Sequence, residues 1–364
     1  MKQKYWIGLS SVEQIDSVLV RTLYEYFGDI ERAFNCSKKD FGANVNIDIN
    51  PKKLETFLSL RDKIDLDKTF DEVERRGINV LTYDDACYPK MLKEIHNPPI
   101  ILYYKGDLFS CNLERTVAFV GSRRASSNGK DSIKRVIGDL KNTDICIVSG
   151  LAEGIDAASH RAAIDNNLKT IGVIASGFDF KYPASNKDLY EKLENGFGAV
   201  VTEYYPTVEP IKFHFPQRNR IVTGLSYGTV VAEASLKSGA LISANLCLEQ
   251  GRELMCIPGL ISNPNTEGIY KLLKNGATLV TCADDILNAL NWEIKTNYKQ
   301  MSFDFNTLSE EQTKIIKCIE CEPKNFDMIL NETQLNADTI LINLTELEIN
   351  GYIKQIEGEK YQLA

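Results

Sequence analysis

The sequence lacks the features that mark several large classes of protein. It has only three histidines in 364 residues, and its formal net charge of −8 argues against a protein that coats nucleic acid through general positive charge. No apolar run approaches the roughly 18 residues that cross a bilayer. The N-terminal apolar stretch is too short for a signal peptide before Glu13 arrives. We therefore expect a cytoplasmic protein with no membrane segment.

Cysteine and cofactor signals are equally sparse. The nine cysteines are scattered and odd in number, and several lie in apolar runs, which is typical of reduced core residues rather than a disulfide framework. Cys318 and Cys321 form a lone CxxC with no nearby histidine, so we expect no zinc site. The loop at 121–126 matches neither G-x-G-x-x-G nor a P-loop. We expect no metal and no cofactor.

What the sequence does contain is an alternation of strands and helices between residues 106 and 292. Short β-branched runs separated by helix-length segments predict a doubly wound, Rossmann-like, mostly parallel sheet in an α/β fold. The predicted strands are 117–121, 145–149, 170–175, 199–203, 229–234, 254–257 and 278–280. This central segment carries as many cations as carboxylates, nineteen of each between residues 113 and 290. A nucleic-acid site would therefore be a local patch within it.

Two other domains flank the sheet. Residues 1–105 predict a helical, SAM-like or helix-hairpin-helix-like domain and a connector, with one helix starting at 11–14 and ending at Gly28. Residues 303–364 predict a winged helix: Ser309 to Gln312 caps the first of three helices, and a hairpin follows. Residues 301–364 have five Lys, no Arg and twelve Asp or Glu. Protein docking or a structural role is favoured there over DNA contact.

Small residues follow three of the predicted strands. The first strand ends at Gly121, and Ser122 and Arg123 follow it. The second strand leads into a loop with Gly150 and Gly154, and the third leads into 176–186. Ligands of parallel sheets bind at the carboxyl ends of strands, where backbone amides favour anions. We expect one shared anion-binding cleft, in which Arg123 clamps a phosphate.

The most informative segment is 210–224, PIKFHFPQRNRIVTG. It interleaves Lys212 with Phe213 and Phe215, and Arg218, Asn219 and Arg220 follow. Two prolines predict a loop that begins a helix near Gln217. Aromatic faces stack on bases and cations hold phosphates, which suits a single-stranded polynucleotide. A buried loop with a structural arginine pair is the open alternative.

Candidate catalytic residues form no convincing set. His160 follows Asp156 at helical spacing and the two can pair, whereas Glu203 and Glu233 end strands near the cleft. We predict that the protein is not an enzyme. The alternative is a Rossmann-like nucleotide phosphoribohydrolase, because 228–233 is similar to a glycine-threonine-glutamate signature, although the glycines that normally precede it are missing.

The chain closely resembles the DprA (Smf) family of DNA-processing proteins. The motifs that carry the resemblance are GSR at 121–123, SGLAEGIDAASH at 149–160, YPASN at 182–186, FPQRNRIVTGLS at 215–226, EASLKSGALISA at 233–244, IPG at 257–259 and NGAT at 275–278. The resemblance implies a single-stranded DNA-binding recombination mediator that protects incoming DNA during natural transformation. It also implies a homodimer formed through the Rossmann-like domain, and the RecA recombinase as the partner that is loaded.

The resemblance also implies roles for individual residues. Ser122 and Arg123 would meet a phosphate, Lys212 would be a second cation, and Phe215 would stack on a base. Arg218, Asn219 and Arg220 would shape or line the same pocket. The sequence departs from the family pattern at 202–206 and 266–270. Because of the second departure, the resemblance does not assign the residues that line the far wall of the cleft.

Overall fold

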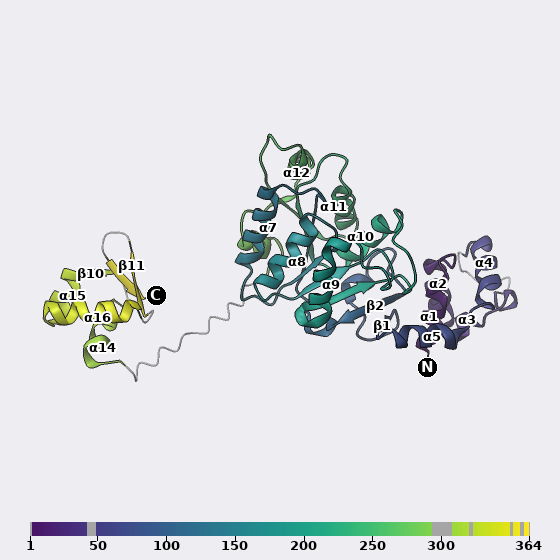
Figure 1. The fold of residues 1–364 in the computed structure, drawn as a ribbon, viewed down its shortest axis with the longest axis horizontal. Helices are drawn as coiled ribbons and strands as arrows, with labels where there is room; N and C mark the ends of the chain where they lie inside the picture. The colour runs from purple at the N-terminus through teal and green to yellow at the C-terminus, as the bar shows by residue number, and fades with distance from the viewer. Residues whose placement is uncertain are drawn as a thin grey trace. The chain divides into compact units, whose positions relative to one another are not determined.

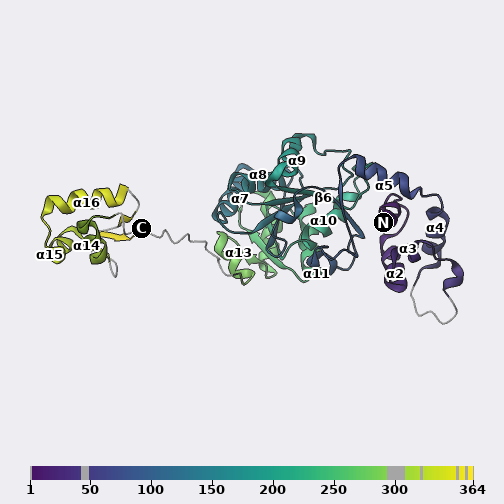
Figure 2. The same ribbon diagram turned by 90° about the horizontal axis from the view of Figure 1, so that it is seen from below.

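The computed structural model describes residues 2–41, 49–292, 308–319, 323–349, 352–356 and 360–363. It divides near residue 295 into two compact units (Figures 1 and 2). No helix among the described residues is long and apolar enough to cross a bilayer.

The larger unit is built on a nine-stranded sheet with the order β1-β2-β6-β5-β4-β3-β7-β8-β9. The strands are β1 (Asn79–Thr82), β2 (Ile101–Gly106), β3 (Thr116–Gly121), β4 (Cys146–Ser149), β5 (Thr170–Val173), β6 (Gly198–Thr202), β7 (Gly228–Ala232), β8 (Glu253–Ile257) and β9 (Thr278–Leu279). β1 and β2 pair antiparallel, and β3 to β9 are parallel. Each of the seven strands predicted between residues 106 and 292 is present, which confirms the fold class.

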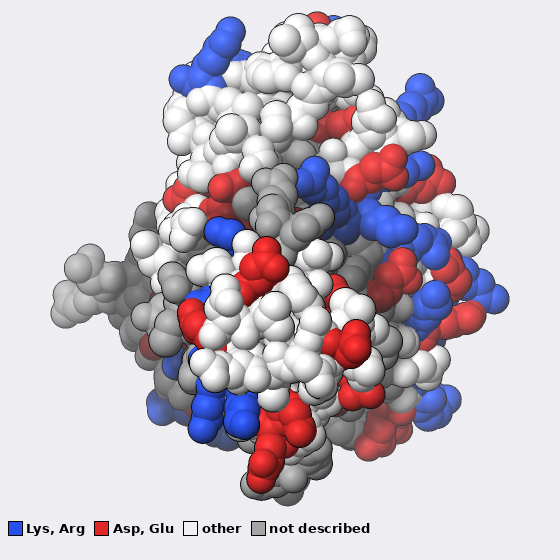
Figure 3. All heavy atoms as spheres, turned by 90° about the vertical axis from the view of Figure 1, so that its left-hand side faces the viewer, with Lys and Arg blue, Asp and Glu red and all other residues white. Residues whose placement is uncertain are grey.

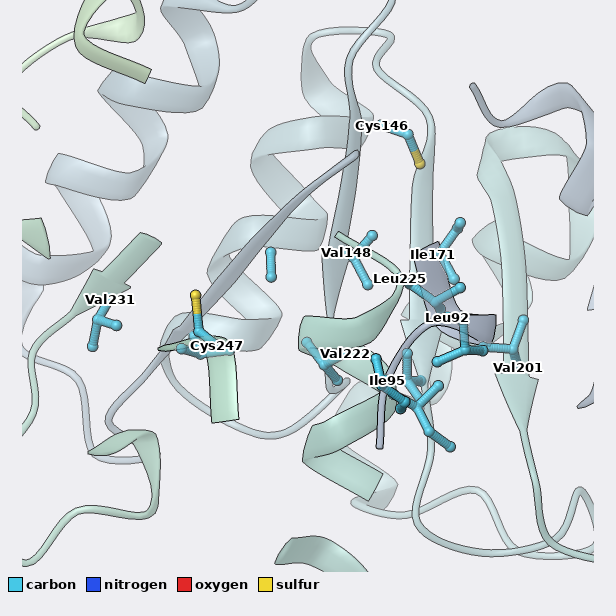
Figure 4. Close-up of a cluster of buried hydrophobic side chains, with 14 of the residues drawn as sticks. Leu92, Ile95, Cys146, Val148, Ile171, Val201, Val222, Leu225, Val231 and Cys247 are labelled. Atoms are coloured by element: carbon cyan, nitrogen blue, oxygen red, sulfur yellow. The ribbon is translucent and has the colours of Figure 1, made fainter. Parts of the chain in front are cut away.

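Helices cover both faces of the sheet, as parallel strands buried on two sides require. One face packs against α7 (Ser127–Asp139), α8 (Ile155–Asp165) and α13 (Ala283–Ala289). The other packs against α6 (Lys90–Lys93), α10 (His214–Gly224), α11 (Gly239–Glu249) and α12 (Glu267–Lys274). The short α9 (Lys187–Lys192) precedes β6. In Figure 4, Val222 and Leu225 from α10 and its C-cap lie near Val148 and Ile171 of the sheet, so this core fixes the position of α10.

Helix α10 begins at His214, three residues before the predicted start near Gln217. The prediction placed Pro216 outside the helix, but Pro216 lies in the first helical turn. A proline is tolerated there because the first backbone N–H groups have no intrahelical acceptor.

The N-terminal residues form α1 (Gln3–Ser10), α2 (Ser17–Phe27), α3 (Ile30–Phe34), α4 (Pro51–Arg61) and α5 (Leu66–Arg75). Helix α2 starts later than the predicted 11–14, because the Asp16 carboxylate accepts a hydrogen bond from Leu19 N and caps the helix there. It ends at Gly28 as predicted, with φ of 67°. These helices share one buried core with Tyr103 of β2 and Val200 of β6.

The smaller unit consists of α14 (Glu310–Ile319), α15 (Phe326–Thr333), α16 (Ala337–Ile349), β10 (Lys324–Asn325), β11 (Ile353–Ile356) and β12 (Lys360–Leu363). The Ser309 hydroxyl accepts from Gln312 N and the Gln312 amide oxygen accepts from Ser309 N, each at 3.1 Å. This is the predicted capping box. Three helices and a three-stranded sheet of order β10-β12-β11 form the expected winged helix.

Candidate nucleic-acid interface

The order of the parallel strands reverses between β3 and β7. The chain runs outward from β3 through β4 and β5 to β6, then returns to place β7 on the other side of β3. A groove of about 780 Å³ opens at the carboxyl ends of these two strands. Such a crevice is where open α/β sheets bind ligands.

Two glycines allow the loops of this groove to approach one another. Gly154 has φ of 79°, and a Cβ atom there would lie 2.1 Å from Ser122 O. A Cβ atom at Gly121 would lie 1.9 Å from Ala232 O on the neighbouring strand. Ile155 N donates to Ser122 O at 3.1 Å and joins the two loops directly. The glycines thus serve close packing of the backbone under the groove.

Arg123 and Phe215 meet at the rim, although they are far apart in the sequence. The guanidinium carbon of Arg123 lies 4.8 Å from the centroid of the Phe215 ring. Tyr182 approaches the same ring edge-on, with centroids 5.7 Å apart, and is 50% exposed. A cation and two rings therefore share one rim, and the family resemblance implied one pocket for Arg123 and Phe215.

The remaining polar residues line the same groove. Lys212 is exposed there, and among the described residues no carboxylate pairs with it. Ser122 Oγ accepts from Arg124 N at 3.1 Å, which leaves its hydroxyl proton for another acceptor. The Asn219 amide also lines the groove. These groups are placed to donate to an anion.

Arg218 is buried beneath the groove, with 3% of its surface exposed. Its Nη1 donates to Gly150 O at 2.5 Å and to Val173 O. Burial lowers the pKa of Arg218 and raises that of the nearby Asp156, whose carboxylate accepts from Gly150 N at 3.1 Å. Arg218 therefore shapes the floor and joins two strand ends, which is the structural alternative left open by the sequence.

Arg220 does not line this groove, contrary to the prediction of one shared pocket. It lines a separate cavity, where its Nη2 lies 2.5 Å from a Glu203 oxygen. On an α-helix, two residues correspond to a rotation of about 200°, so Arg218 and Arg220 point to opposite sides of α10.

The candidate catalytic residues have other roles. His160 and Asp156 do not pair, because His160 Nδ1 bonds Thr170 Oγ1 at 2.7 Å. The Glu233 carboxylate accepts from Ser126 N at 2.8 Å and from the Asn263 amide at 3.0 Å, so it braces the loops. Within the described residues no cluster of His, Cys, Asp and Glu could hold a metal ion. Cys321 of the CxxC lies outside the described residues.

His160 makes stability depend on pH. The one proton of the Thr170 hydroxyl goes to Ile147 O at 2.9 Å, so His160 Nδ1 is the donor, and the lone pair of Nε2 finds no partner in the part of the chain that the structure describes. Burial, with a smaller contribution from the Arg218 charge, lowers the pKa of His160 from 6.5 to about 3.

We expect the free energy of unfolding to fall as pH drops below 6.5, because the unfolded chain binds the proton first. The loss reaches about 3 kcal/mol near pH 4. Urea titrations of the parent and of His160→Asn, whose amide still donates to Thr170, measure it. Equal pH slopes in the two proteins would contradict the assignment.

Sequence reasoning missed Tyr182 as a site residue. Its position in the loop after the third predicted strand was a usable signal for a site residue. Its contact with the Phe215 ring could not be predicted, because Phe215 lies on a different element of the fold. On the face shown in Figure 3, Lys and Arg are interspersed with Asp and Glu. Because residues 113–290 carry as many cations as carboxylates, binding of a polyanion would depend on the local groups of the groove.

Comparison with known proteins identifies the family of the chain. Residues 79–291 match the family model of DNA recombination-mediator protein A, and residues 306–359 match that of the DprA winged helix domain. The chain belongs to the DprA family. As the sequence motifs implied, it is a member of a family of DNA-processing recombination mediators.

Individual DprA proteins show how far the similarity extends. DNA processing protein DprA of Streptococcus pneumoniae is 46% identical over 203 residues, covering 56% of this chain and 71% of that protein. An X-ray structure of DprA from the same organism has a TM-score of 0.65 and 37% identity over 79% of this chain and 96% of that one. DNA processing protein A of Helicobacter pylori, whose structure addresses its single-stranded DNA binding mode, has a TM-score of 0.53 and 28% identity over 59% and 97%.

Proposed function

We propose that the groove at the β3–β7 reversal binds single-stranded DNA. The observation that carries the proposal is the Arg123–Phe215 contact, with Lys212 and Tyr182 on the same groove. Arg123, Lys212 and the Ser122 hydroxyl hold phosphates, while the Phe215 ring stacks on a base. The single-strand binding of the H. pylori relative supports this assignment.

Single strands fit these groups better than a duplex does. A base must be unpaired and unstacked to reach the face of a protein ring, whereas duplex recognition needs a helix or ribbon in a groove. In the winged helix, α15 and α16 contain no Lys or Arg. We propose that the winged helix docks protein or supports structure and does not read duplex DNA.

Membership of the DprA family supports the wider role that we propose. The chain acts in the cytoplasm, without catalysis, protecting incoming single strands during natural transformation and loading RecA onto them. Bracing of Glu233 by Ser126 and Asn263 favours this role over a nucleotide phosphoribohydrolase, because the carboxylate is held by loop groups. Incubation with nucleoside monophosphates tests the alternative, and release of free base would overturn the non-catalytic assignment.

The proposed homodimer forms through the Rossmann-like domain. Strand β9 ends the sheet, and Leu279 on it is 49% exposed. A terminal strand leaves a row of backbone donors and acceptors unpaired, and such an edge can pair with a second copy of the chain. Sedimentation of the parent protein tests this part of the proposal independently of DNA binding.

The proposed site predicts the effect of removing the Phe215 ring. Phe215→Ala is expected to weaken binding to oligo-dT by about 1–3 kcal/mol, the usual value of one stacked base. Phe215→Tyr keeps the ring and is expected to retain most of the affinity. Fluorescence anisotropy with labelled oligo-dT, and with duplex of equal length as competitor, measures both variants. Equal affinity for Phe215→Ala and the parent would show that the ring serves packing alone.

A further inference from the structure

Residues 210–217, here called the ridge, separate two cavities. One side of the ridge faces the proposed DNA groove through Pro210, Lys212, Phe215 and Pro216. The other side faces a second cavity of about 540 Å³ through Ile211, Phe213, His214 and Gln217. The second cavity lies between the ridge, the α1–α2 loop and the end of β6, and it shares no lining residue with the groove.

Phe213 is the conspicuous residue on the second side. It is 68% exposed, more than any other aromatic side chain among the described residues. Its neighbour Ile211 is 47% exposed. Leaving a ring in water forgoes the gain of burial, about 25 cal/mol for each Å² of apolar surface. The exposed Phe213 ring, which follows Lys212 in the sequence, is therefore available for stacking.

The lining of the second cavity suits a nucleobase. The Tyr204 and His214 rings are stacked, with centroids 4.2 Å apart and an interplanar angle of 30°. Arg220 Nη1 and Asn97 Oδ1 are buried and have no hydrogen-bond partner among the described residues. Both residues line this cavity together with the two rings, and donors, acceptors and flat rings are the groups that recognise the edge and face of a base.

Among the described residues, the lining of this cavity offers a phosphate no unpaired Lys or Arg. Glu203 is paired with Arg220 at 2.5 Å, and Asp16 is paired with Lys53 at 2.5 Å. Glu13 is 3.8 Å from His214 Nε2, and its side chain is 51% exposed. The half-exposed Glu13 carboxylate repels a phosphodiester but leaves a neutral base unaffected. The backbone of a strand would therefore stay on the crest, where Lys212 lies.

We propose that a single strand leaving the groove crosses the ridge at Lys212 and stacks a base on Phe213 at the mouth of the second cavity. This inference rests on the proposed function of the groove. It extends the binding site beyond Phe215 to a second ring on the opposite side of the ridge. It therefore makes the affinity depend on oligonucleotide length in a way that a single groove does not.

The test uses the full chain and oligo-dT of increasing length, from about 4 to about 16 nucleotides, the usual range for such sites. Phe213→Ala is expected to leave the affinity for the shortest oligomers unchanged and to weaken that for the longest by about fivefold to a hundredfold. Phe215→Ala is expected to weaken binding at every length. Phe109→Ala is the matched control, because Phe109 is 55% exposed and lines neither cavity.

The possible outcomes separate the two proposals. If Phe213→Ala has no effect at any length while Phe215→Ala still weakens binding, the proposal that the strand crosses the ridge is overturned, and the proposal that the groove binds DNA stands. The second cavity would then suit a peptide. An equal loss at all lengths would also overturn it, since Phe213 would then belong to the groove. Failure of the parent to bind oligo-dT removes the proposed function itself. In a second readout, Phe213→Trp should show emission quenched by long oligomers only.

Discussion

Replacement of Arg218 by methionine is expected to lower the free energy of unfolding of the larger unit by about 3–5 kcal/mol. The substitution leaves the Gly150 and Val173 carbonyls without this donor and removes the cation that acts most strongly on the buried Asp156 carboxyl. Both tryptophans, Trp6 and Trp292, lie in this unit, so urea denaturation followed by tryptophan fluorescence reports its unfolding.

Arg124→Met is the matched control for Arg218. Arg124 is exposed on the loop after β3, and its replacement is expected to change stability by less than about 0.5 kcal/mol. The double variant Arg218→Met, Asp156→Asn should lose less than the sum of the two single variants, because the buried carboxylate is then neutral. A stable Arg218→Met protein that has lost only DNA affinity would contradict the structural role.

Charge reversal at Lys212 has the second large expected effect. Lys212→Glu is expected to weaken binding to oligo-dT by on the order of tenfold or more at low salt, since a phosphate contact becomes a repulsion. Arg123→Ala should reduce the slope of log affinity against log salt by about 0.7, the value for one phosphate of a single strand. Anisotropy titrations over a series of salt concentrations measure both quantities.

Lys141→Glu provides the control for net charge. Lys141 is exposed and precedes β4, so it lies towards the amino ends of the parallel strands, opposite the groove. The same charge change there should leave the salt slope unaltered. Salt slopes equal to that of the parent in both groove variants would remove Arg123 and Lys212 from the site.

The sequence was sufficient for the parts of the site that depend on local pattern. β-branched runs predicted the parallel strands, and their small-residue ends predicted the edge at which ligands bind. These inferences need only chain order and the rule that parallel strands align their carboxyl ends. The placement of Phe215 in the same pocket as Arg123 came instead from the family resemblance, because 210–217 was predicted only as a loop before a helix.

The roles of Arg218 and Arg220 could not be predicted in the same way. Arginine is usually exposed, and Arg218 is buried only because two carbonyls from distant strand ends converge on it. The direction in which the Arg220 side chain points depends on how α10 is rotated about its own axis relative to the sheet. The interleaved order of cations and rings at 210–220 contains no information about which cavity each faces.

The pairing of β2 with β6 has a consequence for how the protein can be cut. Tyr103 and Tyr104 lie opposite Thr202 and Val201 in this antiparallel pair. A fragment that starts at residue 106 would strip this strand away and leave β6 with unsatisfied backbone donors and acceptors. An edge strand with unpaired backbone groups is a template for pairing between molecules and for aggregation. Fragments meant to remain monodisperse should therefore begin before Asn79.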